Sequence, residues 1–298
     1  MPTSTYEHIP LLVSFLIALR PQSILDVGVG NGKMGFVARD LLDVMLGERF
    51  KREAWQIQID GIEIFADYIQ EHHHLLYNRI LIGDAFTLID TMGDYDVVIL
   101  GDVLEHFEKD RALCFLDKCA RHCEHIILSI PLGEQWTQPM IYGNTYEEHR
   151  SFWTKEEIQP FSTDHGIFVF QNIGEYGCFL IKADDLRHYR IMDEADTLFG
   201  EGKRAKAIDG MRSALETLPP HIASEYMLVD LLLKNHQVEE AIGRLRRVLK
   251  MFPDEQAARE YIEALSRGVK KRSEHPWDGG LSDKPGRSRE QAHLGQSG

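Results

Sequence analysis

Three glycines at alternate positions follow the first strand-like segment of this chain and limit what it can fold into. The segment ILDVGVGNG, residues 24–32, places Gly28, Gly30 and Gly32 directly after a short apolar run. A helical pattern begins at Lys33 and continues to residue 46. Glycine lets the backbone turn sharply and approach a ligand closely, and the start of a helix offers free N–H groups. This strand–loop–helix unit predicts a cofactor site.

Strand-like and helical segments alternate over the first 182 residues. Helical patterns at residues 33–46, 67–76 and 107–123 separate apolar runs of strand length, and an apolar helix is expected at residues 9–19. Alternating strands and helices with right-handed crossovers predict a doubly wound α/β fold with a mostly parallel sheet. Two adjoining runs around residues 174–176 predict a terminal antiparallel hairpin. The seven expected strands are residues 23–28, 57–64, 80–82, 96–100, 125–130, 167–173 and 177–182.

A repeat with a period of 34 residues occupies the following region. Gly202 and His236 fall at the turn in each copy. This period is that of tetratricopeptide repeats, whose helix hairpins bury a shared core only when they are stacked. We therefore expect residues 1–183 to form the α/β domain and residues 184–268 a small all-α domain. The matching pairs are Ala207-Ile208 with Ala241-Ile242, Leu215 with Leu249, and Pro219 with Pro253.

Composition excludes several classes of protein. The formal net charge of −14 disfavours binding to nucleic acid or to anionic membranes. No run reaches the roughly 18–20 apolar residues of a membrane helix. No basic residue precedes the first apolar run, so we expect no secretory leader, reduced cysteines and a cytoplasmic location. Residues 269–298 are rich in glycine, serine, proline and charge, and we expect them to form a disordered tail.

Acidic residues near the expected strand ends discriminate between cofactor classes. The string GNGKMG, residues 30–35, also matches the loop that holds the pyrophosphate of nicotinamide cofactors. Asp26 inside the loop would repel a pyrophosphate but suits the ammonium or sulfonium of S-adenosylmethionine. Glu63 is placed to accept hydrogen bonds from both hydroxyls of a ribose in either cofactor. Asp84 is placed to accept from an adenine amino group, with Phe86 covering the ring.

Four segments together resemble one family. The strings ILDVGVGNG, IDGIEIF (residues 59–65), GDAF (83–86) and YDVVILGDVLEHF (95–107) follow the order and spacing of class I S-adenosylmethionine-dependent methyltransferases. The resemblance covers residues 21–182. The later string YGNTYEEHRSFWT (142–154) resembles a subgroup often met among sugar and natural-product methyltransferases. The tetratricopeptide-type repeats are not part of the usual methyltransferase core.

The resemblance implies a role for each matching residue. Asp102, His106 and His149 are the expected catalytic residues, with either histidine as a base for a hydroxyl acceptor. The expected cofactor-binding residues are Asp26, Gly28, Gly30 and Gly32 around the methionine moiety, Glu63 at the ribose, Ile64, Asp84 and Ala85 at the adenine, and Gly101 beside the methionine portion. The expected substrate-binding residues are Glu105, Tyr142, Asn144 and Trp153.

No metal site is expected. The run from His72 to His74 lies on a helical pattern, where consecutive side chains point in different directions, so we expect a solvated face. No C-x-x-C pair is present.

The expected function is transfer of a methyl group from S-adenosylmethionine to a hydroxyl or amine of a small molecule or sugar. Two alternatives remain open. The acceptor is a protein, or the chain is a non-catalytic adaptor that keeps the methyltransferase fold and acts through its repeats. The repeats are expected to bind a partner protein, to pair two chains or to present a carrier-bound substrate. A nicotinamide enzyme is a further alternative, which binding of NAD in place of S-adenosylhomocysteine would reveal.

Overall fold

The computed structural model describes residues 5–141, 143–171 and 173–267. These residues divide between Ala183 and Asp184 into two compact units. The tail expected at residues 269–298 lies outside the described residues, as does Tyr142.

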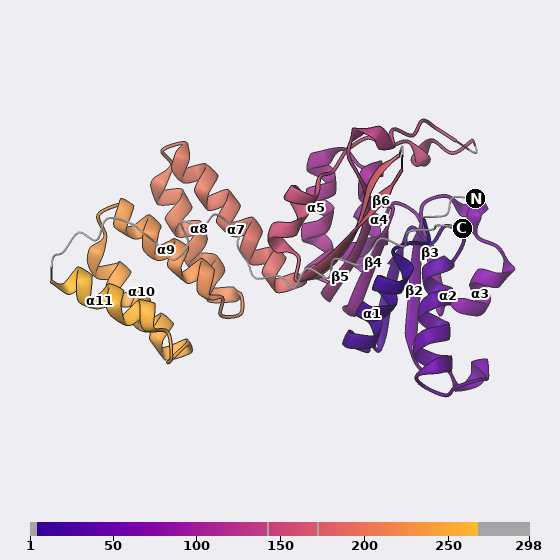
Figure 1. Cartoon of the computed structure of the whole chain (residues 1–298), viewed down its shortest axis with the longest axis horizontal. Coiled ribbons are helices and arrows are strands. Elements are labelled where there is room, and N and C mark those ends of the chain that lie inside the picture. Colours follow the sequence, from indigo (N-terminus) through magenta and orange to yellow (C-terminus); the bar gives the residue numbers. More distant parts are fainter. Residues whose placement is uncertain (1–4, 142, 172, 268–298) are drawn as a thin grey trace, which may run out of the picture. The chain divides into compact units, whose positions relative to one another are not determined.

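The first unit is built around one sheet with the strand order β3-β2-β1-β4-β5-β7-β6 (Figure 1). The ladders that join β3, β2, β1, β4 and β5 are parallel, whereas β7 runs antiparallel to both β5 and β6. The prediction of a mostly parallel seven-stranded sheet with a terminal antiparallel hairpin is confirmed. The strands are β1 (Ser23–Val27), β2 (Gln58–Glu63), β3 (Arg79–Ile82), β4 (Tyr95–Gly101), β5 (Cys123–Leu132), β6 (Asp164–Phe170) and β7 (Gly174–Lys182).

Helices cover both faces of this sheet, with α5 on the side away from α1 and α2 (Figure 1). The expected helix at residues 33–46 is α2 followed by π-helical turns over Asp40–Met45. The expected helix at residues 67–76 is shorter, because only Glu71–Leu76 is α-helical. The helices of this unit are α1 (Ile9–Leu19), α2 (Lys33–Arg39), α3 (Glu71–Leu76), α4 (Ala85–Leu88), α5 (Lys109–Cys119) and α6 (Lys155–Ile158).

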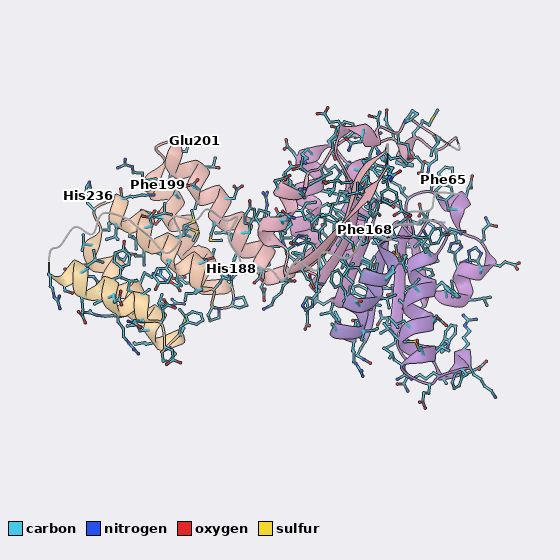
Figure 2. The ribbon with its side chains drawn as sticks, in the orientation of Figure 1. Phe65, Phe168, His188, Phe199, Glu201 and His236 are labelled. Carbon is cyan, nitrogen blue, oxygen red and sulfur yellow. The ribbon has the colours of Figure 1, made fainter. Side chains whose placement is uncertain are left out.

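The core of the first unit forms where α1 and α2 pack on the sheet. Leu12 and Leu16 of α1 and Ala38 of α2 are fully buried in it. Phe168 of β6 packs against the same cluster (Figure 2). The central strand β4 is buried on both faces from Val97 to Leu100, as its unbroken apolar run predicts. The middle of the sheet is therefore closed to solvent.

The second unit consists of helices that share one apolar cluster. Gly202 and His236 both adopt a positive φ, of 81° and 63°, at the turns before α8 and α10. Ala207 and Ala241, 34 residues apart, are both fully buried in the cluster. The helices are α7 (Ala183–Gly200), α8 (Arg204–Thr217), α9 (Ile222–Lys234), α10 (Val238–Met251) and α11 (Gln256–Ser266).

Candidate functional site

The carboxyl ends of the parallel strands surround one cavity of about 410 Å³. Residues at the ends of β1, β2, β3 and β4 line it, because parallel strands all end at the same edge of the sheet. Side chains from the segment 136–150 line it as well. Twelve of the residues expected from the sequence line the cavity: Gly28, Gly30, Glu63, Ile64, Asp84, Ala85, Gly101, Asp102, Glu105, His106, Asn144 and His149.

The glycine loop after β1 has a backbone that other residues adopt only with strain. Gly28, Gly30 and Gly32 have φ values of 75°, 51° and 76°. A Cβ atom on Gly28 would lie 2.9 Å from Cγ2 of Val103. Gly32 does not line the cavity; it precedes α2, and a Cβ there would lie 3.0 Å from the ring of His73. A side chain at these positions would therefore strain the loop, and Gly28 and Gly30 line the cavity without one.

Asp26 lies beneath the loop rather than in the cavity. Its side chain is 2 % exposed, and the Tyr77 hydroxyl donates to its Oδ2 atom at 2.5 Å. The Gly35 N–H donates to the same Tyr77 hydroxyl at 3.1 Å. Burial raises the pKa of Asp26 to about 7, assisted by the nearby Glu63 and opposed by the bond from Tyr77. Asp26 thus supports the loop from beneath, and its side chain does not line the cavity.

The variant Asp26→Asn is expected to lose a pH dependence that the wild type shows. The folded protein holds the Asp26 proton up to about pH 7, whereas the unfolded chain releases it near 3.8. Between these values the folded state binds more protons, so its stability falls as the pH rises and levels off above the folded pKa. Urea unfolding from about pH 5 to about pH 8 measures this window in both proteins. A difference in unfolding free energy that is constant with pH would contradict the prediction.

Glu63 and Asp84 are the acids at the ends of β2 and β3. The Oε2 atom of Glu63 accepts from the Gly30 N–H and its Oε1 atom from the Phe65 N–H, both at 2.9 Å. Burial raises the pKa of Glu63, although these two N–H groups oppose the shift. Asp84 accepts from the Phe86 N–H at 3.0 Å and pairs with Arg111 at 2.5 Å. Both carboxylates are thus held in fixed orientations at the cavity wall.

The end of β4 places Asp102 in the cavity with a left-handed backbone, at a φ of 54°. The Asp102 N–H donates to the Ser129 carbonyl at 2.9 Å, and the Tyr176 hydroxyl donates to Asp102 Oδ1 at 2.8 Å. Burial lowers the pKa of Lys33, and the charge of Asp102 opposes this shift. A strained non-glycine residue held by two partners at a cavity is a feature of functional sites.

Glu105, His106 and His149 form a cluster in the same cavity. Their potential ligand atoms all lie within 4.8 Å of one another. Glu105 is 1 % exposed, and burial, followed by the charges of Asp102 and Glu147, raises the pKa of its carboxyl well above the usual range. Burial also lowers the pKa of both histidines, so both rings are neutral near pH 7.

A polar network closes the cavity on the side of residues 136–150. The Tyr68 hydroxyl donates to Glu147 Oε1 at 2.9 Å, and Asn144 Nδ2 donates to the Tyr68 hydroxyl at 3.1 Å. Trp136 lines the cavity and donates through Nε1 to the Glu175 carbonyl at 2.8 Å. Tyr68 and Glu147 were not singled out from the sequence, because nothing in their local pattern marks contacts across some 79 residues.

Three expectations about individual side chains require correction. Trp153 is 1 % exposed and does not line the cavity, so the structure does not place it beside the other expected substrate-binding residues. Phe86 packs against Phe115 instead of covering a ring in the cavity. His73 is fully buried, with Nε2 3.1 Å from the Gly30 carbonyl, so the histidine run is not a solvated face throughout. The expected role of Tyr142 lies outside the described residues.

Comparison with known proteins identifies the second unit directly. Residues 198–265 match the family model described as tetratricopeptide repeat, and the repeat predicted from the 34-residue period is confirmed. A comparison with curated proteins finds no match. In the parts of the chain that the structure describes, no helix combines the length and apolar character needed to cross a membrane.

Several solved structures are similar to about 60 % of the chain. They include the N-terminal domain of EvdMO1, in the presence of SAH and D-fucose, at 14 % identity and a TM-score of 0.41 over 60 % of this chain and 84 % of that one. The methyltransferase domain of bacterial CtHen1 is 18 % identical, with a TM-score of 0.36 over 58 % and 96 %. Magnesium protoporphyrin IX methyltransferase from Synechocystis PCC 6803, with bound SAH, is 17 % identical, with a TM-score of 0.41 over 59 % and 82 %. All three likenesses are distant, with identities of 14–18 %.

Proposed function

We propose that this protein transfers a methyl group from S-adenosylmethionine to a hydroxyl or amine of a small molecule or sugar. The observation that carries the proposal is the convergence of the glycine loop, Glu63, Asp84 and Asp102 on one cavity at the carboxyl edge of the sheet. Six acids and three basic side chains line that cavity: Glu63, Asp84, Asp102, Glu105, Glu108 and Glu147, with Lys33, Arg111 and Arg150.

The lining fits S-adenosylmethionine better than a nicotinamide dinucleotide. An excess of carboxylates favours a sulfonium and an ammonium group and disfavours a pyrophosphate. The positive φ values of Gly28 and Gly30 leave the loop backbone open to the methionine moiety. Lys33 lies where a cofactor carboxylate would be balanced, since it lines the same cavity.

In this proposal each wall of the cavity has a separate task. Glu63 accepts hydrogen bonds from the ribose hydroxyls, while Asp84, Ala85 and Ile64 hold the adenine. S-adenosylmethionine supplies a methyl group on a positively charged sulfur, which is reactive toward a nucleophile in line with the S–C bond. Asp102, Glu105, His106 and His149 face the acceptor, and either neutral imidazole can take up the proton of a hydroxyl acceptor. The lining side chains of residues 136–141 and 143–150 help to align the reactants and to exclude water.

The experiment that tests the cofactor is calorimetric titration with S-adenosylhomocysteine. The variant Glu63→Gln is expected to bind at least about tenfold more weakly than the wild type, because the amide keeps only one of the two acceptor atoms of the carboxylate. Glu71→Gln, at an exposed acid on α3, is the matched control and should bind as the wild type does. Binding of NAD but not S-adenosylhomocysteine would overturn the proposal.

The repeats support a second part of the proposal. Tetratricopeptide hairpins present extended surfaces to partner molecules. We propose that the second unit binds a protein partner or a second copy of this chain. If wild-type protein binds no S-adenosylhomocysteine, the alternative of a non-catalytic adaptor is favoured, with the repeats as its binding surface.

A further inference from the structure

We propose that Glu105, His106 and His149 bind a divalent transition-metal ion in the cavity. Within the described parts of the chain, this is the group of three potential metal-ligating side chains whose ligand atoms come together, all within 4.8 Å of one another. Two of the residues are adjacent after β4, and the third arrives from a segment more than 40 residues later. Such convergence was not visible in the sequence, where no metal site was expected.

Glu105 is the first observation that points to a cation. Both of its carboxylate oxygens are buried, and neither has a hydrogen-bond partner in the structure. Asp102 and Glu147 add negative charge nearby. Burying a polar group without a hydrogen-bond partner is unfavourable, and burying a charged one is more so. A cation beside Glu105 removes this cost by giving the carboxylate a counter-charge and a ligand.

The two histidines are the second observation. Nδ1 of His106 lies 3.1 Å from the Glu148 carbonyl, and Nδ1 of His149 is hydrogen-bonded to the Trp136 carbonyl. A carbonyl oxygen only accepts, so a proton on each Nδ1 satisfies these two contacts and leaves a lone pair on each Nε2 for a metal ion. Metal-ligating histidines in proteins are oriented in this way by a carbonyl or carboxylate on the other nitrogen.

The charged groups around the cluster are compatible with a bound cation. Arg150 is the basic side chain that faces His106, and it pairs with Glu148 at 3.6 Å. The main-chain carbonyl of Asp102 also faces the His106 ring and adds a further oxygen to the surroundings. A catalytic base would need the Nε2 lone pair of only one histidine, whereas a metal ion uses the Glu105 carboxylate and both imidazoles together.

The ligand set indicates the kind of ion. Two imidazoles with one carboxylate suit zinc, iron or manganese, whereas magnesium and calcium prefer an all-oxygen set. Ligands of one zinc ion at about 2.1 Å lie roughly 3–3.5 Å from each other. Side-chain movements of about 1–2 Å therefore close the cluster around an ion.

The metal site narrows the class of methyl acceptor, and this inference rests on the proposed function. A hydroxyl that contacts a divalent cation is more acidic than a free one. With the ion bound, both imidazoles are ligands and not bases, so the hydroxyl proton passes to water. The hydroxyl oxygen lone pair forms the new bond to the methyl carbon as the S–C bonding pair returns to sulfur. The products are a methyl ether, S-adenosylhomocysteine and a hydrated proton. A hydroxyl acceptor is therefore favoured over an amine, whose own lone pair already suffices.

The test is calorimetric titration of untagged, chelator-treated full-length protein with Zn²⁺. We expect about one ion per chain, bound at least about tenfold more weakly by Glu105→Gln and by His149→Gln. Mg²⁺ is expected to bind far more weakly than Zn²⁺. The matched control is the double variant His72→Gln and His74→Gln, two exposed histidines that offer an adventitious site, and it should bind as the wild type does.

The outcomes separate this inference from the proposed function. Glutamine keeps the shape of a protonated Glu105, and thermal unfolding checks that each variant folds. Absence of Zn²⁺ binding, or binding lost in the control but kept in Glu105→Gln, overturns the metal site. If S-adenosylhomocysteine still binds in that case, the cofactor proposal stands alone. If Zn²⁺ binds and S-adenosylhomocysteine does not, the metal site stands and the methyl-transfer function fails.

Discussion

Replacing Trp153 by alanine is expected to lower the free energy of unfolding of the first unit by about 3–5 kcal/mol, because it empties a fully enclosed site. The ring is 1 % exposed, its Nε1 donates to Ser151 Oγ at 3.0 Å, and the Lys109 ammonium lies 3.6 Å from the ring centroid. Removing the ring therefore leaves a cavity and also leaves the Ser151 hydroxyl without this donor.

Urea unfolding, followed by the fluorescence of Trp55 and Trp136, measures the effect. Phe152→Ala is the matched control, since this neighbouring side chain is 39 % exposed and should change stability by about 0.5 kcal/mol or less. If Trp153 instead contacts substrate, Trp153→Ala will fold as stably as the wild type and change only substrate binding.

The variant Asp43→Asn is expected to destabilise the first unit by about 3–5 kcal/mol, because it breaks a buried ion pair. Asp43 is fully buried, pairs with Arg39, which is 3 % exposed, and accepts from Arg49 at 2.9 Å. The asparagine variant leaves the Arg39 guanidinium buried without its counter-charge. Asp40→Asn changes an exposed acid within one helical turn of Asp43. It is the control and should change the free energy of unfolding by about 0.5 kcal/mol or less.

The pH dependence of this pair gives an independent check. Burial alone would raise the pKa of Asp43, but the hydrogen bonds from the Gln56 N–H, Arg39 and Arg49 outweigh it and lower the pKa. An acid with a lowered pKa stabilises the fold above its unfolded value, and this stabilisation is lost as the pH falls through the folded value. The gap in unfolding free energy between wild type and Asp43→Asn should therefore narrow in acid. A gap that does not change with acidity would show that the carboxylate charge is unimportant.

The parts of the site that could be predicted are those determined by local backbone geometry. The three glycines adopt positive φ values, and their close spacing in a short stretch of sequence predicts such a backbone. Glu63 and Gly101 end strands and Asp84 follows one closely, and the sequence placed all three at one site because parallel strands end at one edge of the sheet. The 34-residue repeat was readable for a similar reason, since each copy contacts mainly its neighbours.

The parts that were missed depend on contacts between distant segments. Tyr77 bonds to Asp26 across 51 residues, so the sequence did not reveal that this carboxylate is held away from the cavity. Trp136 and Trp153 look alike as aromatic residues in one segment, yet the first lines the cavity and the second is buried. Only packing against other elements separates them.

The amino-acid sequence by itself determined the order of strands and helices, the shape of the glycine loop and the period of the repeats, because each follows from propensity and spacing along a short stretch. The tertiary structure decided which side chains face the cavity and which partners they have. It brought His149 to Glu105 and His106, and it left the Glu105 carboxylate buried without a hydrogen bond. Such an arrangement depends on how distant segments pack, and the free energy of that packing cannot be derived from any one segment alone.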